Sequence, residues 1–316
     1  MAIGVALCAC ASRPLPSWND TPARAAIINF VEDAAAPSGS SAIPREQRIA
    51  VFDNDGTLWS EQPLYFQLLF AIDRVHALAP QRPEWKSEEP FRSILAGDTP
   101  GALAQGKPAI EKILAATHAG MTTDEFDALV RAWARTARHP STGRLYTEMV
   151  YQPMLELLDY LESRGFNTYI VSGGGVGFMR AWASEAYGVP PERIIGSSGR
   201  TAFEVRGGRP VLVKQPEIWS IDDGPGKPAN IDLHIGRRPV IAVGNSDGDF
   251  EMLEWTTSAP GPRLGVLIHH TDAQREWAYD RDSHIGALKR GLDEADARGW
   301  IIIDMSADWA TVHPPR

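Results

Sequence analysis

Two aspartates, two residues apart, are the part of this chain best suited to chemistry. Residues 49–52 form a short apolar run, and Asp53-Asn54-Asp55-Gly56-Thr57 follows directly. The run predicts a buried strand, and Gly56 predicts a turn after it. On a continuing strand the two carboxylates would point in opposite directions, so they converge only because the strand ends there. Such a pair can divide the work of catalysis, with one carboxylate as nucleophile and the other as general acid and base.

Two more polar, glycine-rich segments follow apolar runs further along the chain. Ser172-Gly173-Gly174-Gly175 comes after residues 166–171, and Gly244-Asn245-Ser246-Asp247-Gly248-Asp249 comes after residues 239–243. Helical patterns separate these runs, and such alternation is typical of a parallel α/β sheet. Ligands of such sheets bind beyond the carboxyl ends of the strands. We therefore expect the three polar turns to meet in one crevice.

The region between the first and second strands has a different pattern. Residues 59–150 carry apolar residues at helical spacing and show no strand-like alternation. We therefore expect an α/β core over residues 21–58 and 151–316, interrupted by an all-helical insertion over residues 59–150. The other elements expected in the core are a helix over 151–164, a hairpin over 201–213, strands over 264–268 and 300–303, and a helix over 293–298.

Composition limits the possible functions. The chain has 316 residues, of which 43% are hydrophobic, so it can bury a sizeable core. Its net charge is −9, which argues against nucleic-acid binding by neutralisation of phosphates. The sequence contains no run of about 18 apolar residues, so we expect no membrane-spanning helix.

Both cysteines, Cys8 and Cys10, lie near the N-terminus. The folded body therefore has no disulfide, zinc–thiolate cluster or thiol nucleophile. Residues 3–10 are similar to the end of an export signal, and residues 7–10 resemble a bacterial lipoprotein processing site. We expect residues 1–20 to be a leader and linker, and the protein to be periplasmic or tethered to a membrane by a lipid on Cys10. The alternative is an ordinary N-terminal segment on a cytoplasmic protein.

The three strand ends and one lysine together resemble the motifs of the haloacid dehalogenase-like (HAD) hydrolases, in particular the phosphatase branch. Residues 53–57 are similar to the first motif, Ser172 to the second, Lys227 to the third, and residues 244–249 to the fourth. The helical insertion is similar to the C1 cap of the group that includes phosphoserine phosphatases. The resemblance implies an α/β fold: a HAD-type, Rossmann-like parallel-sheet core with an inserted all-helical cap.

The resemblance also implies the reaction, which is hydrolysis of a small phosphomonoester with Mg²⁺ as cofactor. Asp53 would become an aspartyl-phosphate, and Asp55 would act as general acid and then as base. Asp53 and the backbone carbonyl of Asp55 would ligate the metal. Asp55 favours a phosphatase, because the dehalogenase members of the family have no carboxylate at that place. Lys227 would supply positive charge, and the expected phosphate-binding residues are Thr57, Ser172, Gly173 and Gly174.

The fourth motif departs from the family pattern at Asn245, where phosphoserine phosphatase-like relatives usually have aspartate. An asparagine can ligate Mg²⁺ through its carbonyl oxygen but brings no charge. We assign Asn245 as a direct metal ligand and Asp249 as the next carboxylate, with Asp247 as a further candidate.

Several residues have two interpretations. Lys214 is the alternative to Lys227 as the catalytic lysine. Glu61 is either a contact for the amine of a phosphoserine-like substrate or a solvated residue at a helix start. His269 and His270 are adjacent on an expected strand and point apart, so they are not expected to form a metal pair.

Two alternative functions are consistent with the same motifs. One is another HAD activity, such as phosphoryl transfer or a phosphonate reaction. The other is capture of a phosphorylated ligand without turnover, which the uncharged Asn245 would suit.

Overall fold

The computed structural model describes residues 13–315, and an eight-stranded sheet runs through its core. The strand order is β4-β3-β2-β1-β5-β6-β7, with β8 beside β6. Strands β3, β2, β1, β5, β6 and β8 are parallel, whereas β4 and β7 pair antiparallel with β3 and β6. The strands are β1 (Ile49–Phe52), β2 (Asn167–Gly175), β3 (Ile194–Arg206), β4 (Arg209–Ser220), β5 (Ile241–Gly244), β6 (Leu264–Thr271), β7 (Ala278–Tyr279) and β8 (Ile301–Asp304).

Strand β1 lies in the middle of the sheet, between β2 and β5. Its four residues are buried on both faces, which explains why the strand is continuously apolar rather than alternating. Phe52 pairs in register with Ile170 of β2 and Val243 of β5, so the three strands end at the same edge. The expected meeting of the three polar turns is therefore a consequence of strand register.

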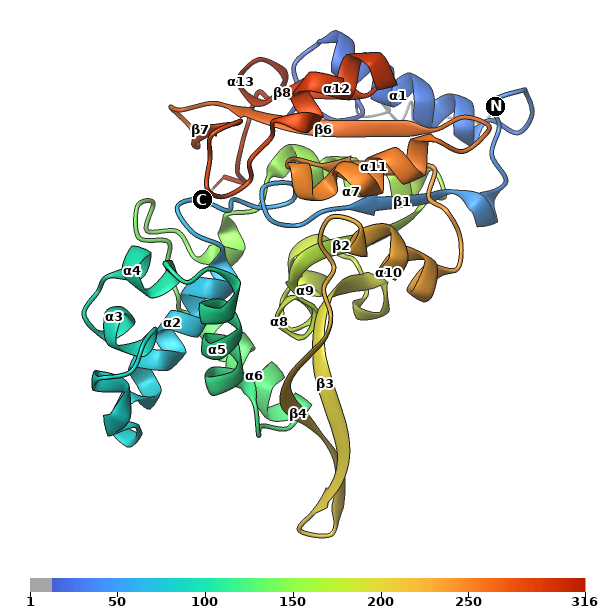
Figure 1. Cartoon of the computed structure of the whole chain (residues 1–316). Helices are drawn as coiled ribbons and strands as arrows, with labels where there is room; N and C mark the ends of the chain where they lie inside the picture. The colour runs from blue at the N-terminus through green and yellow to red at the C-terminus, as the bar shows by residue number, and fades with distance from the viewer. Residues whose placement is uncertain (1–12, 316) are drawn as a thin grey trace, which may run out of the picture.

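Helices cover both faces of the sheet (Figure 1). Ala50 and Phe52 pack in one buried cluster with α1 and α7, and Ile49 and Val51 pack in a second cluster with α10, α11 and α12. No helix between residues 13 and 315 is long and apolar enough to span a membrane. The core helices are α1 (Pro22–Ala35), α7 (Gln152–Ser163), α8 (Val176–Arg180), α9 (Ala183–Tyr187), α10 (Gly226–Ile235), α11 (Phe250–Thr257), α12 (Arg290–Arg298) and α13 (Met305–Asp308).

A separate group of helices lies between β1 and α7 in the sequence, and we call it the cap. It occupies the lower left of Figure 1, away from the sheet. The cap contains α2 (Phe66–Leu78), α3 (Phe91–Leu95), α4 (Thr99–Leu103), α5 (Lys107–His118) and α6 (Thr123–Ala134). The fold predicted from the sequence, a parallel core with an inserted helical cap, is confirmed. Cys8 and Cys10 lie outside the described residues, so lipid attachment stays a prediction.

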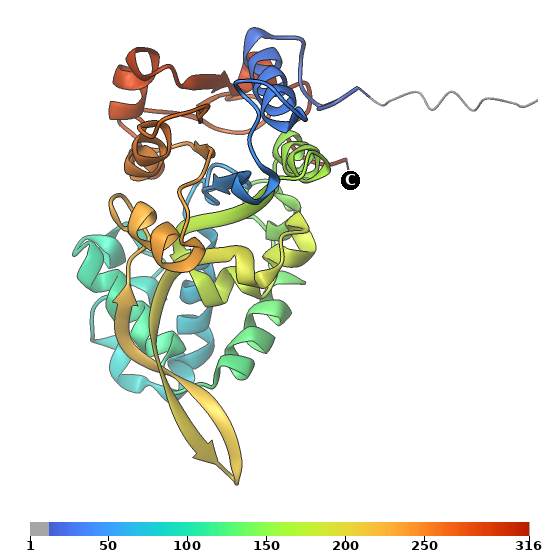
Figure 2. The ribbon, with the colours of Figure 1, turned by 90° about the vertical axis from the view of Figure 1, so that its right-hand side faces the viewer.

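The hairpin of β3 and β4 is longer than the sequence pattern predicts. It extends well beyond the sheet and reaches down beside the cap (Figures 1 and 2). Two backbone hydrogen bonds join it to the cap: Lys214 N–H donates to the Met121 carbonyl, and Gly120 N–H donates to the Lys214 carbonyl, both at 2.9 Å. The outer part of the hairpin is solvated, with Phe203 70% exposed. The length of the hairpin is therefore set by the pairing of β3 with β4 and by the contact of β4 with the cap, rather than by burial of alternate residues.

Phe70 of α2 holds the cap on the core. Its ring is fully buried and lies 5.5 Å from Phe178 of α8 and 5.5 Å from Trp133 of α6, centroid to centroid. We expect Phe70→Ala to lower the free energy of unfolding by about 3–5 kcal/mol, because it removes a large buried side chain and leaves a cavity. Leu233→Ala is the control, because Leu233 is 70% exposed and its loss should change stability by less than about 0.5 kcal/mol. Equal denaturant midpoints for the two variants would contradict this packing role.

Asp222 anchors the chain where the hairpin returns to the core. Its carboxylate accepts a hydrogen bond from Asn230 of α10 at 2.9 Å and is fully buried. Burial raises the pKa of Asp222 to about 6, although the charge of Lys227 lowers it in part.

The folded protein therefore holds the Asp222 proton between about pH 4 and pH 6, where the unfolded chain has released it. The unfolding free energy should fall by up to about 3 kcal/mol as pH rises through this window. Asp222→Asn mimics the protonated acid, so denaturation curves from pH 4 to pH 8 should show the variant gaining stability relative to wild type as pH rises. Parallel pH dependence in the two proteins would show that Asp222 is ionised throughout.

Candidate active site

Asp53 and Asp55 follow β1 and line the same cavity. The Asp53 backbone N–H donates to the Val243 carbonyl at 2.9 Å, which continues the sheet by one residue. The chain then turns at Gly56, whose φ is +77° and where a Cβ would collide with the Asn245 side chain. Trp59 Nε1 donates to Asp55 Oδ1 at 2.9 Å and fixes that carboxylate. The strand end thus brings the two carboxylates together as the sequence predicts.

Lys227 lies in the first turn of α10 and is only 2% exposed. Its Nζ donates to Asp53 Oδ1 at 2.5 Å, to Asp249 Oδ1 at 2.6 Å and to the Val171 carbonyl at 2.9 Å. These contacts use all three N–H donors of the ammonium group. Burial lowers the pKa of Lys227, but the charges of Asp249 and Asp53 outweigh it and raise the pKa overall. Lys227 is therefore a fixed positive charge beside Asp53.

Asp249 and Asp247 have partners other than those assigned from the sequence. Asp249 Oδ1 binds Lys227, and Oδ2 accepts the backbone N–H groups of Asn245 and Ser246 at 2.9 and 3.0 Å. The structure thus shows Asp249 as a partner of Lys227, and its assignment as a metal ligand stays a prediction. Asp247 accepts backbone N–H groups of residues 289–291 at the start of α12 and does not line the cavity. Its assignment as a further metal ligand does not fit this position.

Asn245, Thr57 and Glu61 form a buried chain of hydrogen bonds. Thr57 Oγ1 donates to Asn245 Oδ1 at 3.1 Å, and Asn245 Nδ2 donates to Glu61 Oε1 at 2.8 Å. The Tyr279 hydroxyl donates to the same Glu61 oxygen at 2.7 Å. Thr57 thus orients the Asn245 amide instead of lining the cavity. Glu61 is 2% exposed, so its interpretation as a solvated residue is wrong, and Gly286, at φ +67°, has no Cβ because Glu61 fills that space.

The cluster carries more negative than positive charge. Asp53 and Asp249 contact Lys227, and the carboxyl groups of Asp55 and Glu61 lie close enough to Asp53 to repel its negative charge. Burial and then the charge of Asp249 raise the pKa of Asp53 well above its usual range, against the opposing effect of Lys227. Burial also raises the pKa of Glu61, and the charges of Asp55 and Asp53 add to this effect. A divalent cation would offset this excess negative charge, so the donor set fits one.

The available metal donors are mostly oxygen atoms from neutral groups. No cluster of three or more His, Cys, Asp or Glu side chains between residues 13 and 315 is arranged to hold a metal. The candidates are the Asp53 carboxylate, the Asn245 amide oxygen and the Asp55 backbone carbonyl. All are hard oxygen donors of the kind that suit Mg²⁺.

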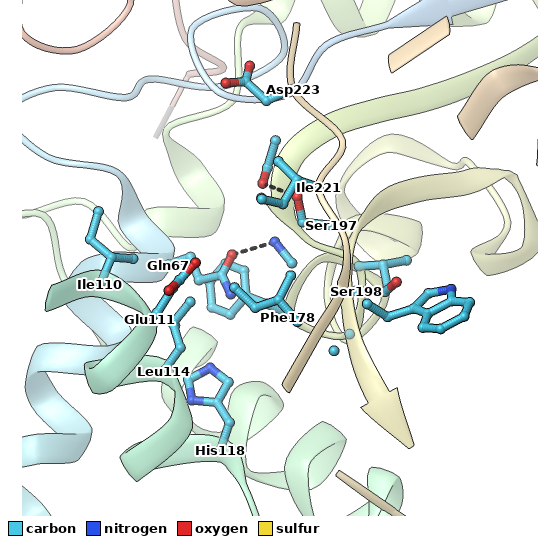
Figure 3. A pocket seen from close by; sticks show the side chains of 18 of the residues that line it. Gln67, Ile110, Glu111, Leu114, His118, Phe178, Ser197, Ser198, Ile221 and Asp223 are labelled. Carbon is cyan, nitrogen blue, oxygen red and sulfur yellow. Dashed lines mark hydrogen bonds between the residues drawn. The ribbon is translucent and has the colours of Figure 1, made fainter. Parts of the chain in front are cut away.

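The second strand end supplies hydrogen-bond donors. Ser172 is fully buried, and its Oγ accepts the Gly174 N–H at 3.0 Å and lies 3.5 Å from Asp55 Oδ2. Gly173 and Gly174 line the cavity. Gln67 of α2 reaches this loop, and its Oε1 accepts the Gly175 N–H at 2.6 Å (Figure 3).

Two of these residues, Gln67 and Tyr279, were not predicted from the sequence. The one available signal for Gln67 is that it is a polar residue within the apolar segment 66–72 at the start of α2. Tyr279 had no sequence signal, because it reaches Glu61 only through the pairing of β7 with β6.

The cavity itself measures about 1030 Å³ and lies between the strand ends, the cap and the β3–β4 hairpin. In Figure 3, Ile110, Leu114 and His118 of α5 face Ser197, Ser198 and Ile221 across it. Cavities of about 300–1,000 Å³ enclose drug-sized ligands. The catalytic end therefore opens into space for a group much larger than phosphate.

The alternative residues lie elsewhere. Lys214 of β4 lines the cavity wall, with its Nζ 4.4 Å from the centroid of the Phe126 ring, and does not contact Asp53. His269 and His270 point apart, as expected: His269 lies 3.4 Å from Asp280, and His270 Nε2 hydrogen-bonds the Gly56 carbonyl at 2.8 Å.

Comparison with known proteins identifies the family of this chain. The haloacid dehalogenase-like hydrolase family matches residues 50–254, and no curated protein matches the chain. Three solved structures are similar in fold. A protein with unknown function from Bordetella pertussis Tohama I is 18% identical, with a TM-score of 0.49, and the match covers 82% of this chain and 99% of that one. A functionally unknown protein from Anaerococcus prevotii DSM 20548 is 17% identical, with a TM-score of 0.46 and coverage of 78% and 85%.

The third structure is a phosphoserine phosphohydrolase-like protein from Francisella tularensis subsp. tularensis SCHU S4. It is 16% identical, with a TM-score of 0.40 and coverage of 79% and 98%. The family match spans both the turn that carries Asp53 and Asp55 and the loop that carries Asn245 and Asp249. This chain therefore belongs to the haloacid dehalogenase-like hydrolases.

Proposed function

We propose that this hydrolase cleaves phosphomonoesters through a phosphorylated Asp53. The proposal rests on the hydrogen bonding of the Asp53 carboxylate, which has one oxygen bonded and the other free of donors within the described part of the chain. Its Oδ1 is held by Lys227, whereas no residue between 13 and 315 donates a hydrogen bond to Oδ2. The residue lines the cavity, so an unengaged carboxylate oxygen is available for attack on phosphorus.

Charge neutralisation supports this reaction. Phosphate monoesters resist nucleophiles because their oxygens are negatively charged, so catalysis depends on compensating charge and alignment. The Lys227 ammonium group supplies one fixed positive charge beside Asp53. A Mg²⁺ ion held by Asp53, Asn245 and the Asp55 carbonyl would supply further charge to the phosphate oxygens. The Gly174 and Gly175 N–H groups already donate to Ser172 Oγ and Gln67 Oε1. The Gly173 backbone, which lines the cavity, and the Ser172 hydroxyl would donate hydrogen bonds to the same phosphate oxygens.

Asp55 is suited to proton transfer. Burial raises its pKa above the usual range, so it holds a proton more readily than an ordinary aspartic acid. As Asp53 Oδ2 bonds to phosphorus, the bond from phosphorus to the leaving oxygen breaks, and that oxygen takes the Asp55 proton. The Asp55 carboxylate then takes a proton from water, whose oxygen bonds to phosphorus as the bond to Asp53 breaks. Inorganic phosphate is released, and Asp55 is protonated again.

The substrate side of the proposal covers phosphomonoesters in general rather than phosphoserine alone. Glu61, which would contact a substrate amine, already accepts two hydrogen bonds at Oε1, from Tyr279 and Asn245. The cavity is also larger than a phosphoserine molecule requires. Phosphoserine remains one member of the substrate screen.

Replacing the nucleophile tests the proposal. Asp53→Asn should reduce release of 4-nitrophenol from 4-nitrophenyl phosphate with Mg²⁺ by at least about 10³-fold, because amide oxygen is a far weaker nucleophile. Asp232→Asn, an exposed change on α10, is the matched control for aspartate loss. Circular dichroism establishes that both variants are folded. Wild-type activity in folded Asp53→Asn would refute the nucleophile assignment, and phosphate binding without turnover by the wild type would favour a binding protein.

Replacing Asp55 separates the two chemical steps. 4-Nitrophenolate leaves without a proton, so Asp55→Asn should still phosphorylate Asp53 with this substrate but should hydrolyse the intermediate about 10²–10⁴-fold more slowly. Rapid mixing should then show a burst of one equivalent of 4-nitrophenolate per enzyme. Intact-protein mass spectrometry should detect the added phosphoryl group. Unchanged steady turnover without a burst would assign the proton transfers to another residue.

A further inference from the structure

Lys214 is a cation without an acidic partner at the cavity wall. It comes from β4, and its Nζ lies over the Phe126 ring of α6 at 4.4 Å from the centroid. No carboxylate between residues 13 and 315 forms an ion pair with it, and burial alone lowers its pKa. A partly buried ammonium without a counter-charge is costly in free energy. Its backbone holds the cap to the hairpin, but this role does not require a charged side chain.

His118, at the end of α5, adds a second unsatisfied group to the same region. It lines the cavity, is 9% exposed, and its Nε2 has no hydrogen-bond partner among the described residues. Thr117 Oγ1 donates to the Ile113 carbonyl at 2.7 Å, so it accepts from His118 Nδ1 at 2.6 Å. Burial and the charge of Lys214 lower the pKa of His118 to about 3, so the imidazole is neutral. In this tautomer His118 Nε2 is an acceptor that lacks a donor within residues 13–315, whereas Lys214 lacks a negatively charged acceptor there, so a carboxylate would satisfy Lys214 and a hydroxyl group would satisfy His118.

Three other cations of the described residues line the cavity, and each differs from Lys214. Lys227 is bonded to Asp53 and Asp249, and Arg180 Nη2 donates to the Ile194 carbonyl at 2.8 Å. Arg200 is exposed to solvent, with its guanidinium over the Trp219 ring at 4.7 Å. Lys214 is therefore the partly buried cation of this wall whose ammonium group has no hydrogen bond to an oxygen of the described residues, and its single charge matches a singly charged carboxylate better than a phosphate dianion. The cavity wall between Lys214 and the catalytic aspartates is mainly apolar, with contributions from Ile110, Leu114, Phe126 and Phe178.

We propose that Lys214 binds a carboxylate on the alcohol part of the substrate, whose apolar body fills the cavity between Lys214 and Asp53. This inference rests on the proposed phosphatase function and names its substrate class: phosphomonoesters of apolar or aromatic hydroxy acids. Lys214 is thus a specificity residue, and the hairpin that carries it is part of the substrate site.

Two aryl phosphates test the proposal directly. 4-Carboxyphenyl phosphate and phenyl phosphate differ by the carboxylate, and wild type should favour the first by roughly tenfold or more in kcat/KM, because a hydrogen bond to a charged group is made only with it. Lys214→Met removes the charge at similar length, and the ratio should fall to about one. Differences in leaving-group chemistry are the same in both enzymes and cancel in this comparison.

Two further variants distinguish the effect of the positive charge at position 214 from the effect of losing any lysine. Lys214→Arg keeps the charge and should retain most of the preference, whereas Lys86→Met, an exposed change in the cap, should leave the wild-type ratio intact. If Lys214→Met hydrolyses the two substrates with the wild-type ratio, the carboxylate site is refuted while the phosphatase function stands.

Calorimetric titration with 4-hydroxybenzoate and phenol makes the test independent of turnover. Wild type should bind 4-hydroxybenzoate more tightly than phenol, and Lys214→Met should lose this difference. If wild type releases phosphate from neither ester but shows this binding pattern, the phosphatase proposal fails and the carboxylate site is supported. Equal affinity for the two ligands in wild type would overturn the site.

Discussion

The buried ion cluster around Lys227 is the constraint on which the rest of the site depends. One ammonium group joins Asp53 after β1, Asp249 after β5 and the Val171 carbonyl in β2, so it fixes three neighbouring strands at one level. Buried charges are stable only when they are paired and hydrogen-bonded, and removing one partner leaves the others uncompensated. The same contacts that position the nucleophile therefore stabilise the sheet edge, and this edge cannot shift in register without separating the charges.

Asn245 has a physical explanation in this setting. Its amide donates to Glu61 and accepts from Thr57, which an ionised aspartate could not do because a carboxylate only accepts hydrogen bonds. Aspartate at this position would also place another negative charge in a cluster that already holds four carboxylates. The departure from the family pattern and the buried Glu61 are thus two parts of one arrangement, in which Glu61 supplies a carboxyl group close to the site while residue 245 remains neutral.

The cavity wall opposite Asp53 and Asp55 comes from outside the parallel core. It is built by the cap and the β3–β4 hairpin, which meet through backbone hydrogen bonds at Lys214 and residues 120–121. In the proposed function, the strand edge carries out the reaction, while the lengths and side chains of the cap and the hairpin determine which alcohol fits. Phe70 connects the cap to the catalytic strand edge, because it packs the cap against α8, which directly follows the Gly173–Gly175 loop.

Local sequence was enough to predict the α/β core, the helical insertion and the convergence of Asp53, Asp55, Ser172 and Asn245, because apolar runs and glycine-rich turns are local signals of strands and their ends. The sequence left two lysines as candidates for the contact with Asp53, Lys214 after an apolar run and Lys227 between a glycine and a proline. The choice between them depends on the fold, because Lys214 lies on β4 and Lys227 on α10. Long-range contacts also pair Asp249 with Lys227 and bury Glu61 against Tyr279, more than 200 residues away in the chain. These choices depend on long-range strand pairing and on the balance of buried charges, which no local pattern encodes.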